Sequence, residues 1–317
     1  MRYFVTGGAG FIGSVLVEKI LGRKGNKVTV YDNLSSGKLE HIDDFREDKN
    51  FSFIKGDILN LNRLKEVMNK HDFVYHLAAN PDIRLGTQHT RLDFEINTIG
   101  TLNVLEAMIK NGVKMIAFAS TSTVFGTPSE IPTQEDYGPC LPESLYGASK
   151  LACEGFVSAY AHLFGVKAWI FRFANITGSP ATHGIIFDFY NKVRKNPKEL
   201  EVLGDGNQTK SYVTNRMLVD AMELSIRKTI NQKQKIFLYN IGNEDKISVK
   251  NITKIFLKEN KLTSKVRYTG GKIGWKGDVA MMRLDISKIK RLGWKPNKTS
   301  RQCIVETVRQ ISEHEMN

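Results

Sequence analysis

The chain has 317 residues, of which 41% are hydrophobic and 9% aromatic, values typical of a globular protein with a sizeable buried core. This length fits one large α/β domain or two domains, and excludes a single small core. The formal net charge is +13, which is compatible with a nucleic acid, an anionic substrate or a basic solvated surface. The basic residues lie in short patches such as "KNPK" and "RKTINQKQK", so we expect no nucleic-acid partner.

The cysteines and the apolar segments exclude several further classes. Cys140, Cys153 and Cys303 are odd in number and lack metal-ligand spacing, so we expect neither a disulfide framework nor a metal site. Glycines, Glu18 and Lys19 interrupt the N-terminal apolar stretch, which argues against a signal peptide. No apolar run approaches the ~20 residues of a membrane span. We expect a soluble, cytoplasmic protein that does not associate with membranes.

Short β-branched and aromatic runs alternate with amphipathic stretches through the first half of the chain. Strands are predicted at residues 2–6, 27–32, 51–57, 72–79, 115–120 and 168–174, with helices between them that include 14–21, 61–70 and 101–112. Alternation at this spacing is typical of right-handed βαβ units. Because the strands are almost continuously apolar, both faces of their sheet should be covered. The predicted fold is α/β, with a Rossmann-type, doubly wound parallel sheet.

The pattern changes after about residue 174. Residues 176–189 and 200–212 are expected to form long functional loops with short elements. Helices are then predicted at 218–228 and 249–260, a strand at 265–270 and a helical tail from Ser300. We therefore expect a smaller C-terminal α/β domain over residues 174–317. Segments near 212–242 are expected to return to the first domain, residues 1–173.

A glycine-rich stretch, "VTGGAGFIGS", joins the first predicted strand to the first helix. Gly7, Gly10 and Gly13 have the spacing GxxGxxG, which suits a tight turn and the close approach of a pyrophosphate to the N-terminus of a helix. Asp32 ends the next strand, 19 positions after Gly13. A carboxylate there accepts hydrogen bonds from the adenosine ribose and repels a 2′-phosphate. The two features together predict a dinucleotide site that favours NAD over NADP.

Two acidic residues in this region also have plain structural interpretations. The alternative for Asp32, which the preceding motif disfavours, is a plain N-cap of the turn that follows it. Asp57 follows the third strand, where it would either reach the adenine amino group or act as an ordinary turn residue.

Hydroxyl side chains gather in "ASTSTVFG", residues 119–126, at the end of the fifth predicted strand. Ligands bind at this edge of an open α/β sheet, although hydroxyls there also cap helices and turns. Further along, "YGASK" places Tyr146 and Lys150 at positions i and i+4 on one face of a helix. An ammonium beside a phenol favours the phenolate. Lowering a tyrosine pKa from ~10 to ~7 takes about 4 kcal/mol, which a partly buried lysine together with the positive nicotinamide ring of NAD⁺ would supply. Such a pair alone is common on solvated helices, whereas in this context we interpret it as catalytic.

Several of these motifs occur in a characteristic order: TGGAGFIG, Asp32, "HLAAN", the hydroxyl cluster, "YGASK" and "RFANITG". In this order they resemble extended short-chain dehydrogenases/reductases of the NAD-dependent epimerase/dehydratase family. Later motifs, "LGDGNQTKSYV", "GWKGDV" and "DISKIKRLGWKP", are most similar to UDP-glucose 4-epimerases, especially the archaeal type. The resemblance spans nearly the whole chain. It implies that residues 1–173 bind NAD and that residues 174–317 mainly bind a nucleotide sugar.

The resemblance also implies roles for the catalytic residues. Tyr146 would be the general base and acid, and Lys150 would orient the nicotinamide ribose and depress the tyrosine pKa. Thr121 would hydrogen-bond the sugar O4, with Ser122 beside it. Asn97 would lie behind the active site, near the nicotinamide.

The implied ligand contacts form two groups. Those to NAD are Gly7, Gly10, Phe11, Ile12, Gly13, Asp32, Asn33, Ser35, Ser36, Gly37, Asp57, Ile58, Leu77, Ala78, Ala79, Asn97, Ser120, Tyr146 and Lys150. Those to the substrate are Asn80, Thr121, Ser122, Asn175, Gly184, Ile185, Leu203, Lys210, Lys276 and Asp278. Within the second group, Asn175 and Lys210 would hold the diphosphate and Asp278 the uridine ribose.

The chain departs from the family pattern in three places. Trp275 stands where the family has a phosphate-binding Arg, with Lys272 and Lys276 as candidate substitutes. Lysine supplies a point charge without the bidentate fork of arginine. Asn215 stands where an acidic residue is common, and Phe125 replaces a tyrosine.

The implied activity is NAD-dependent 4-epimerisation of a UDP-sugar through a 4-keto intermediate, in a homodimer. UDP-glucose and UDP-galactose are the expected pair. UDP-glucuronate and UDP-N-acetylhexosamines remain alternatives, because the volume of the sugar pocket decides which substrate is accepted. Thr121 is followed by Ser122 and Thr123 instead of an Asp-Glu pair, which argues against a 4,6-dehydratase. A dehydrogenase of the same superfamily would accumulate NADH, and an NAD-sensing regulatory module would bind without turnover. Both remain alternatives.

Overall fold

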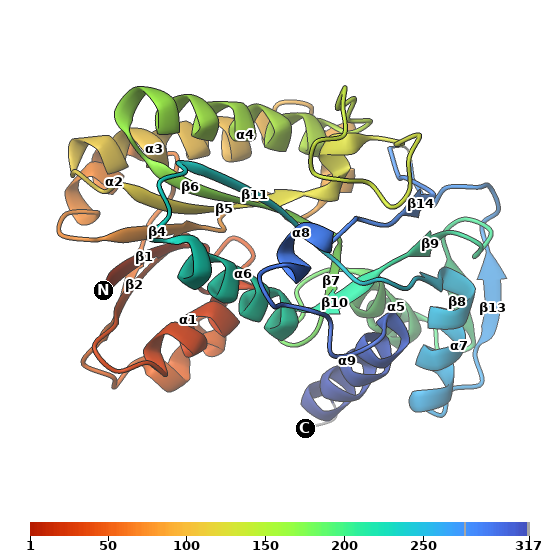
Figure 1. Cartoon of the computed structure of the whole chain (residues 1–317). Helices are drawn as coiled ribbons and strands as arrows, with labels where there is room; N and C mark the ends of the chain where they lie inside the picture. The colour runs from red at the N-terminus through yellow and green to blue at the C-terminus, as the bar shows by residue number, and fades with distance from the viewer. Residues whose placement is uncertain (276, 316–317) are drawn as a thin grey trace.

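The computed structural model describes residues 1–275 and 277–315, arranged around a seven-stranded parallel sheet (Figure 1). The strand order is β11-β6-β5-β4-β1-β2-β3, and all neighbouring strands run parallel. The strands are β1 Arg2–Thr6, β2 Lys27–Asp32, β3 Phe51–Lys55, β4 Phe73–His76, β5 Met115–Thr121, β6 Lys167–Phe173 and β11 Ile236–Ile241. The predicted doubly wound sheet is confirmed.

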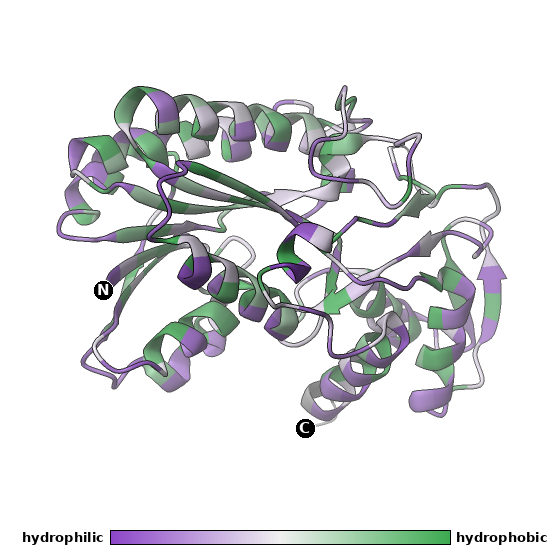
Figure 2. Cartoon of the chain, viewed as in Figure 1, coloured by the Kyte–Doolittle hydropathy of each residue, from purple (hydrophilic) through white to green (hydrophobic). Residues whose placement is uncertain are grey.

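Helices cover both faces of this sheet, because its strands are apolar on both sides. The helices are α1 Gly13–Leu21, α2 Leu61–Val67, α3 Gly100–Lys110, α4 Leu145–Phe164 and α6 Asn215–Thr229. Helices α2, α3 and α4 pack side by side on one face, and α1 packs with α6 on the other (Figure 1). Phe4 and Val5 of β1 belong to the cores of opposite faces, and both are fully buried. Hydrophobic colouring accordingly runs along the central strands (Figure 2).

The chain reverses its course across the sheet between β1 and β4. From β1 it builds β2 and β3 on one side, and then β4, β5 and β6 on the other. In open α/β sheets such a switch point leaves a ligand-binding crevice at the carboxyl ends of the strands. The loops after β1 and β4 touch here, since a Cβ on Gly7 would lie 2.7 Å from the nitrogen of Ala78. The glycine stretch therefore faces the end of β4.

Small sheets and four more helices form a second lobe (Figure 1). The strand pairs are β7 Asn175–Thr177 with β10 Tyr212–Thr214, β8 Glu199–Val202 with β13 Lys265–Tyr268, and β9 Thr209–Lys210 between β12 Ile247–Ser248 and β14 Met281–Met282. The helices are α5 Ile185–Lys195, α7 Val249–Glu259, α9 Ser300–Glu315 and the short α8 Ser287–Lys290, which contacts β11 of the main sheet. Within the described residues, no helix has the length and apolar character to cross a membrane.

Helix α5 begins inside residues 176–189, which the sequence predicted mainly as a loop. Ile186, Phe189, Tyr190 and Val193 are buried at helical spacing. The rings of Phe189 and Tyr190 meet Phe256 of α7 edge-on. The loop prediction is therefore wrong for the last residues of that stretch, because an apolar stripe packs them onto a neighbouring helix.

Asn215 joins three segments that are distant in the sequence. Its Nδ2 donates hydrogen bonds to the carbonyl oxygens of Phe11, at 3.1 Å, and Ser179, at 2.9 Å. It begins α6, where the preceding Thr214 accepts a hydrogen bond from the Met217 N–H. An amide suits this position better than the acidic residue common in the family, because two carbonyl oxygens require a donor. Asn215 thus ties the glycine loop to the second lobe.

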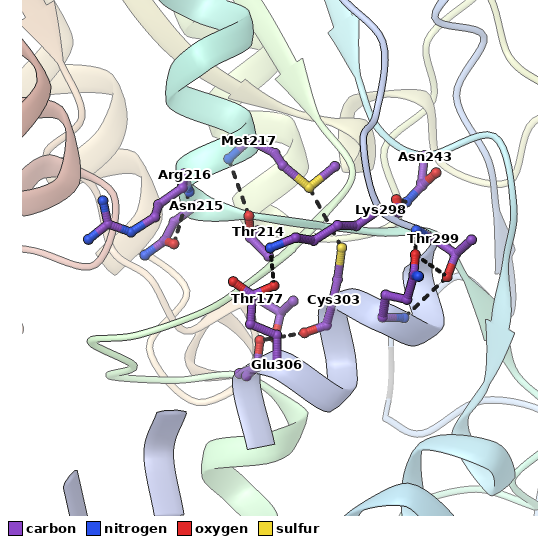
Figure 3. A network of polar contacts seen from close by, with 12 residues as sticks. Thr177, Thr214, Asn215, Arg216, Met217, Asn243, Lys298, Thr299, Cys303 and Glu306 are labelled. Atoms are coloured by element: carbon purple, nitrogen blue, oxygen red, sulfur yellow. Dashed lines mark hydrogen bonds and ion pairs between the residues drawn. The ribbon is translucent and has the colours of Figure 1, made fainter. Parts of the chain in front are cut away.

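Helix α9 is attached to the same junction, as Figure 3 shows. Thr177 Oγ1 of β7 donates to Thr307 Oγ1 at 2.9 Å, and Cys303 Sγ lies 3.8 Å from Met217 Sδ. Both contacts are buried, so the C-terminal helix supports the strands that carry the second lobe.

We predict that Asn215→Asp destabilises the protein. The substitution removes two donated hydrogen bonds and turns a buried carboxylate toward two carbonyl oxygens. Because an unsatisfied buried group costs about 1–3 kcal/mol, the free energy of unfolding should fall by about that amount in a denaturant titration. Arg216→Gln, at the exposed neighbour that pairs with Glu18, is the control and should change it by less than about 0.5 kcal/mol. Equal stability of Asn215→Asp and the wild type would contradict the proposed linkage.

Candidate active site

The loop after β1 has the close backbone contacts that its glycines predicted. Gly7 has φ +72°, and a Cβ on Gly13 would lie 2.2 Å from the Gly7 carbonyl oxygen. A Cβ on Gly10 would lie 3.2 Å from the same oxygen. The loop leads into α1, with Phe11 buried and Ile12 as the residue before the helix.

The same loop fits a dinucleotide diphosphate. Its first helical turn presents backbone N–H groups at the positive end of α1. Ser14 lies in this turn, and its buried Oγ has no hydrogen-bond partner among the described residues. That hydroxyl remains available to a phosphate oxygen.

Asp32 lies at the end of β2 and is 7% exposed. Its Oδ2 accepts a hydrogen bond from Ala9 N at 3.0 Å and its Oδ1 one from Leu34 N at 2.8 Å. Burial raises the pKa of the carboxyl, and these two hydrogen bonds counteract the rise. Each oxygen keeps a second lone-pair direction, so the residues suit the ribose hydroxyls of NAD. The interpretation of Asp32 as a turn cap also fits one of these bonds, and the two roles are compatible.

The residues predicted to contact the adenosine part of NAD follow the ends of β2 and β3. Asn33 Nδ2 donates to Asp57 Oδ2 at 2.9 Å, so these two predicted residues meet. Ser35 and Ser36 are exposed at the rim, and Ile58 is buried beside Asp57. The loop closes over the glycine stretch at Gly37, where a Cβ would lie 2.9 Å from Ala9.

His76 ends β4 and was not predicted as a site residue. Its Nδ1 lies 2.7 Å from Thr6 Oγ1 and its Nε2 lies 2.9 Å from Thr101 Oγ1. Burial and the nearby Lys150 ammonium lower the pKa of His76 to about 3, so the ring is neutral at physiological pH. The imidazole joins β1, β4 and α3 beneath the crevice. The predicted Leu77, Ala78 and Ala79 follow it, each partly exposed.

Tyr146 and Lys150 occupy the first two turns of α4. Ser144 starts this helix by accepting a hydrogen bond from Gly147 N at 3.0 Å. Lys150 is 2% exposed, and its Nζ donates to the Ala119 carbonyl oxygen at 2.9 Å. The same Nζ lies 6.0 Å from the centre of the Tyr146 ring. Burial lowers the pKa of Lys150 to about 8.

The electrostatics of Tyr146 differ from the sequence-based expectation. Burial raises the pKa of the phenol, and Asp93 and Cys153 raise it further. The lowering expected from Lys150 is therefore opposed by the partial burial of the ring and by the nearby acidic groups. A second positive charge beside the ring, such as that of the expected nicotinamide, would favour the phenolate.

The hydroxyl cluster at the end of β5 divides into two environments. Ser120 Oγ donates to Glu154 Oε1 at 2.5 Å, and Glu154 forms a buried ion pair with Arg172 at 2.7 Å. The Ser120 side chain, predicted to contact NAD, is therefore engaged with α4. Thr121 accepts a hydrogen bond from Thr123 N at 3.2 Å and caps the turn. Thr121 and the adjacent Ser122 are 8% and 7% exposed. In the described residues, neither hydroxyl forms a hydrogen bond with Glu154 or Arg172, and Thr121 Oγ1 lies 3.1 Å from Thr123 Oγ1.

Asn97 lies in a π-helical segment, Phe94–Ile99, before α3. Its Oδ1 accepts a hydrogen bond from Asn80 N at 2.9 Å, and its Nδ2 donates to Ser149 Oγ at 2.9 Å. Ser149 Oγ in turn donates to the Tyr146 carbonyl oxygen at 2.8 Å. The predicted residues Asn80, Asn97 and Tyr146 thus belong to one chain of hydrogen bonds. Single-turn π-helical insertions are frequent at functional sites.

The predicted residues of the second lobe lie on several of its elements. Asn175 of β7 is paired in register with Tyr212 of β10. Burial and Asp278 raise the pKa of Tyr212, which the sequence did not indicate as a site residue. Gly184 and Ile185 stand at the start of α5, and Leu203 packs beside Gly274.

Lys210 and Asp278, expected to contact different parts of the nucleotide, form an ion pair at 2.5 Å. Asp278 is buried, and Lys210 Nζ lies 5.7 Å from the centre of the Trp275 ring. The buried Trp275 Nε1 has no partner in the described part of the chain. Lys272 is exposed, and Lys276 lies outside the described residues. A lysine, an acid and an indole N–H therefore stand where the family presents its arginine.

The arrangement supports acid–base chemistry at an alcohol beside a nicotinamide. Tyr146 offers an ionisable phenol, Lys150 places a positive charge 6.0 Å from the centre of its ring, and the glycine loop with Asp32 is shaped to accept a dinucleotide. Over the described ranges, no cluster of three His, Cys, Asp or Glu side chains is arranged to hold a metal ion.

The chain is similar to known proteins over nearly its whole length. The family model described as GDP-mannose 4,6-dehydratase matches residues 4–307. A crystal structure of a UDP-galactose 4-epimerase is 37% identical, with a TM-score of 0.89 and 99% of each chain covered. The UDP-glucose 4-epimerase of Thermotoga maritima with UDP-glucose is 30% identical, with a TM-score of 0.86 and coverages of 99% and 100%. The UDP-glucuronic acid 4-epimerase of Bacillus cereus with UDP-glucuronic acid and NAD is 25% identical, with a TM-score of 0.88 and the same coverages.

We predict that Lys150→Met changes how stability depends on pH. The pKa of Lys150 falls from 10.5 to about 8 on folding, so between these values the unfolded chain binds more protons and wild-type stability rises with pH. The variant lacks this rise. Its stability relative to the wild type should therefore decrease by about 3 kcal/mol from about pH 7.5 to 10.5, measured by denaturant unfolding. Lys254→Met, at an exposed position of α7, should show no such change, and a flat difference for Lys150→Met would refute the buried charge.

Proposed function

The chain belongs to the GDP-mannose 4,6-dehydratase family of extended short-chain dehydrogenases/reductases, and from this premise we propose that it is an NAD-dependent UDP-sugar 4-epimerase. The proposal depends most on the Tyr146–Lys150 pair beside the nucleotide crevice. End-to-end similarity to epimerases of UDP-glucose and UDP-glucuronic acid supports a UDP-sugar as substrate. UDP-glucose and UDP-galactose are the expected pair, which would place the enzyme in galactose metabolism.

The chain's own residues suit each task in this reaction. The glycine loop and Asp32 would hold NAD, which would supply reversible hydride acceptance for the sugar C4. Tyr146 removes the 4-OH proton and later returns it to the oxygen of the 4-keto sugar. Thr121 hydrogen-bonds that oxygen, and Lys150 binds the ribose and favours the phenolate. Proton transfer of this kind contributes ~10²–10⁴-fold to rates.

The second lobe supplies the nucleotide contacts in this proposal. Asn175 and Lys210 bind the diphosphate, and Asp278 binds the uridine ribose. Because Lys210 and Asp278 are already paired, we expect them to bind the nucleotide as one unit. The division at about residue 173 would separate the NAD-binding part from the sugar-binding part, with α6 and β11 returning to the first.

A dehydratase reaction is disfavoured by the residues after Thr121. Elimination of water across C5 and C6 needs an acid and a base near C6, whereas Ser122 and Thr123 offer hydroxyls only. A simple dehydrogenase reaction would release NADH, and the product analysis below separates it from epimerisation.

The outer side of α4 supports a homodimer. Its 20 residues expose no Lys, Arg, Asp or Glu, since Lys150 and Glu154 both point inward and are buried. The exposed positions on this side include Leu145, Ala148, Ala152, Phe156, Ala159 and Leu163. Small residues among larger apolar ones let two helices approach closely. The free thiols of all three cysteines fit a reducing compartment, and we propose a cytoplasmic location.

Incubation with a panel of UDP-sugars tests the proposed activity. We expect UDP-glucose and UDP-galactose to interconvert with no net NADH, and Tyr146→Phe to lower turnover at least 10²-fold while NAD and UDP-sugar still bind, because the proton acceptor is lost. Product chromatography and NADH absorbance provide the measurements. Accumulating NADH would indicate a dehydrogenase, and turnover of Tyr146→Phe within a few fold of wild type would refute the base assignment.

Sedimentation analysis tests the dimer. We expect the wild type to sediment as a dimer and Ala152→Glu as a folded monomer, because the new carboxylate would be desolvated against the partner helix. Lys254→Glu, an exposed charge reversal on α7, should leave the dimer intact. A monomeric wild type, or a dimeric Ala152→Glu, would contradict the proposed interface.

A further inference from the structure

Asp93 is a buried carboxylate that neither the predicted motifs nor the proposed reaction uses. It is 1% exposed and directly precedes the π-helical segment Phe94–Ile99. Its Oδ1 accepts hydrogen bonds from Asn80 Nδ2 at 3.0 Å and from Asn97 Nδ2 at 3.3 Å. Both amides belong to the hydrogen-bond chain that ends at Tyr146. The carboxylate is therefore fixed to the network that positions the base.

The second oxygen of Asp93 is unused. Oδ2 is buried and has no hydrogen-bond partner in residues 1–275 and 277–315. It faces the backbone of Gly86, where a Cβ would lie 2.9 Å away. One neutral oxygen would be enough to accept the hydrogen bonds of both amides. Burying a charged carboxylate here therefore costs free energy without adding a hydrogen bond. The negative charge itself therefore needs an explanation.

The charge faces the catalytic pair. Asp93 raises the pKa of Tyr146 and, with Cys153 and Glu154, counteracts the lowering of the Lys150 pKa by burial. Conversely, burial raises the pKa of Asp93 and Lys150 lowers it. Asp82, paired with Arg84 on the neighbouring loop, also faces Asp93 and raises its pKa. Asp93 thus acts as a counter-charge to the buried ammonium of Lys150.

We propose that Asp93 is a positioning residue whose buried negative charge keeps Tyr146 protonated until a cationic nicotinamide is bound beside it. Lys150 and Asp93 then act in opposite directions on the phenol, and the additional positive charge decides the balance. The base would form only in the loaded enzyme, which avoids a buried phenolate without a partner. The proposal rests on the role of Tyr146 as base, but its test does not require turnover.

The test measures the tyrosinate absorbance of the protein as a function of pH, in the presence of saturating NAD⁺. The signal of Tyr146 is the difference between each protein and the same protein carrying Tyr146→Phe. Asp93→Asn keeps an oxygen at Oδ1 for Asn80 and Asn97 and places its NH₂ at the unused Oδ2, so it removes charge without breaking a hydrogen bond. We expect its Tyr146 midpoint to lie about one pH unit lower, a tenfold change in the acid constant. Glu95→Gln, an exposed charge on the same segment paired with Arg91, should leave the midpoint unchanged.

Asp93→Glu keeps the charge and should leave the midpoint close to that of the wild type. An unchanged or higher midpoint in Asp93→Asn would overturn the proposal and leave Asp93 a purely structural clamp. Should Asp93→Asn yield no folded protein, Asp93→Ser carries the same test. Failure of both neutral variants to fold while Asp93→Glu folds would also overturn it. Failure of the epimerase proposal would instead appear as absent UDP-sugar turnover with the titration shift intact.

Discussion

The buried ammonium of Lys150 is the interaction on which the candidate site depends. Its hydrogen bond to the Ala119 carbonyl oxygen, at 2.9 Å, fixes α4 to the end of β5, so Tyr146 and Thr121 share one edge of the sheet. Desolvating this charge is costly, and burial correspondingly lowers the pKa of Lys150 to about 8. The surrounding Cys153, Asp93 and Glu154 oppose that lowering. The fold therefore has to stabilise the buried charge of Lys150 with nearby acidic groups and a backbone carbonyl.

The candidate site lies where the second lobe meets the switch point between β1 and β4. The parallel sheet supplies the strand ends, while the second lobe returns to them through Asn215, whose amide bridges Phe11 and Ser179. The pairing of Lys210 with Asp278 gives that lobe a neutral polar unit in place of a free cation. The net charge of +13 is therefore carried elsewhere than at this pair.

The fold of the first half was readily predicted. The strands at residues 2–6 and 27–32 match β1 and β2 to the residue, because continuous apolar runs bounded by turns leave little choice. The second half was harder to predict, because its strands are short. Strands of two or three residues, such as β9 and β7, are stabilised by pairing with other strands and are too short to show an alternation of apolar and polar residues. Helix α5 was missed because glycine and proline precede its apolar stripe. The π-helical segment before α3 has no sequence signature of its own.

The sequence by itself determined the residues whose spacing is local: Gly7, Gly10 and Gly13 in one turn, and Tyr146 with Lys150 on one helical face. Only the tertiary structure decided their surroundings. Ser120 faces Glu154, Asp93 faces the catalytic pair, and burial moves the pKa of Tyr146 upward. Local spacing follows from helix and strand geometry, whereas desolvation and long-range charge depend on what the whole chain packs around each group.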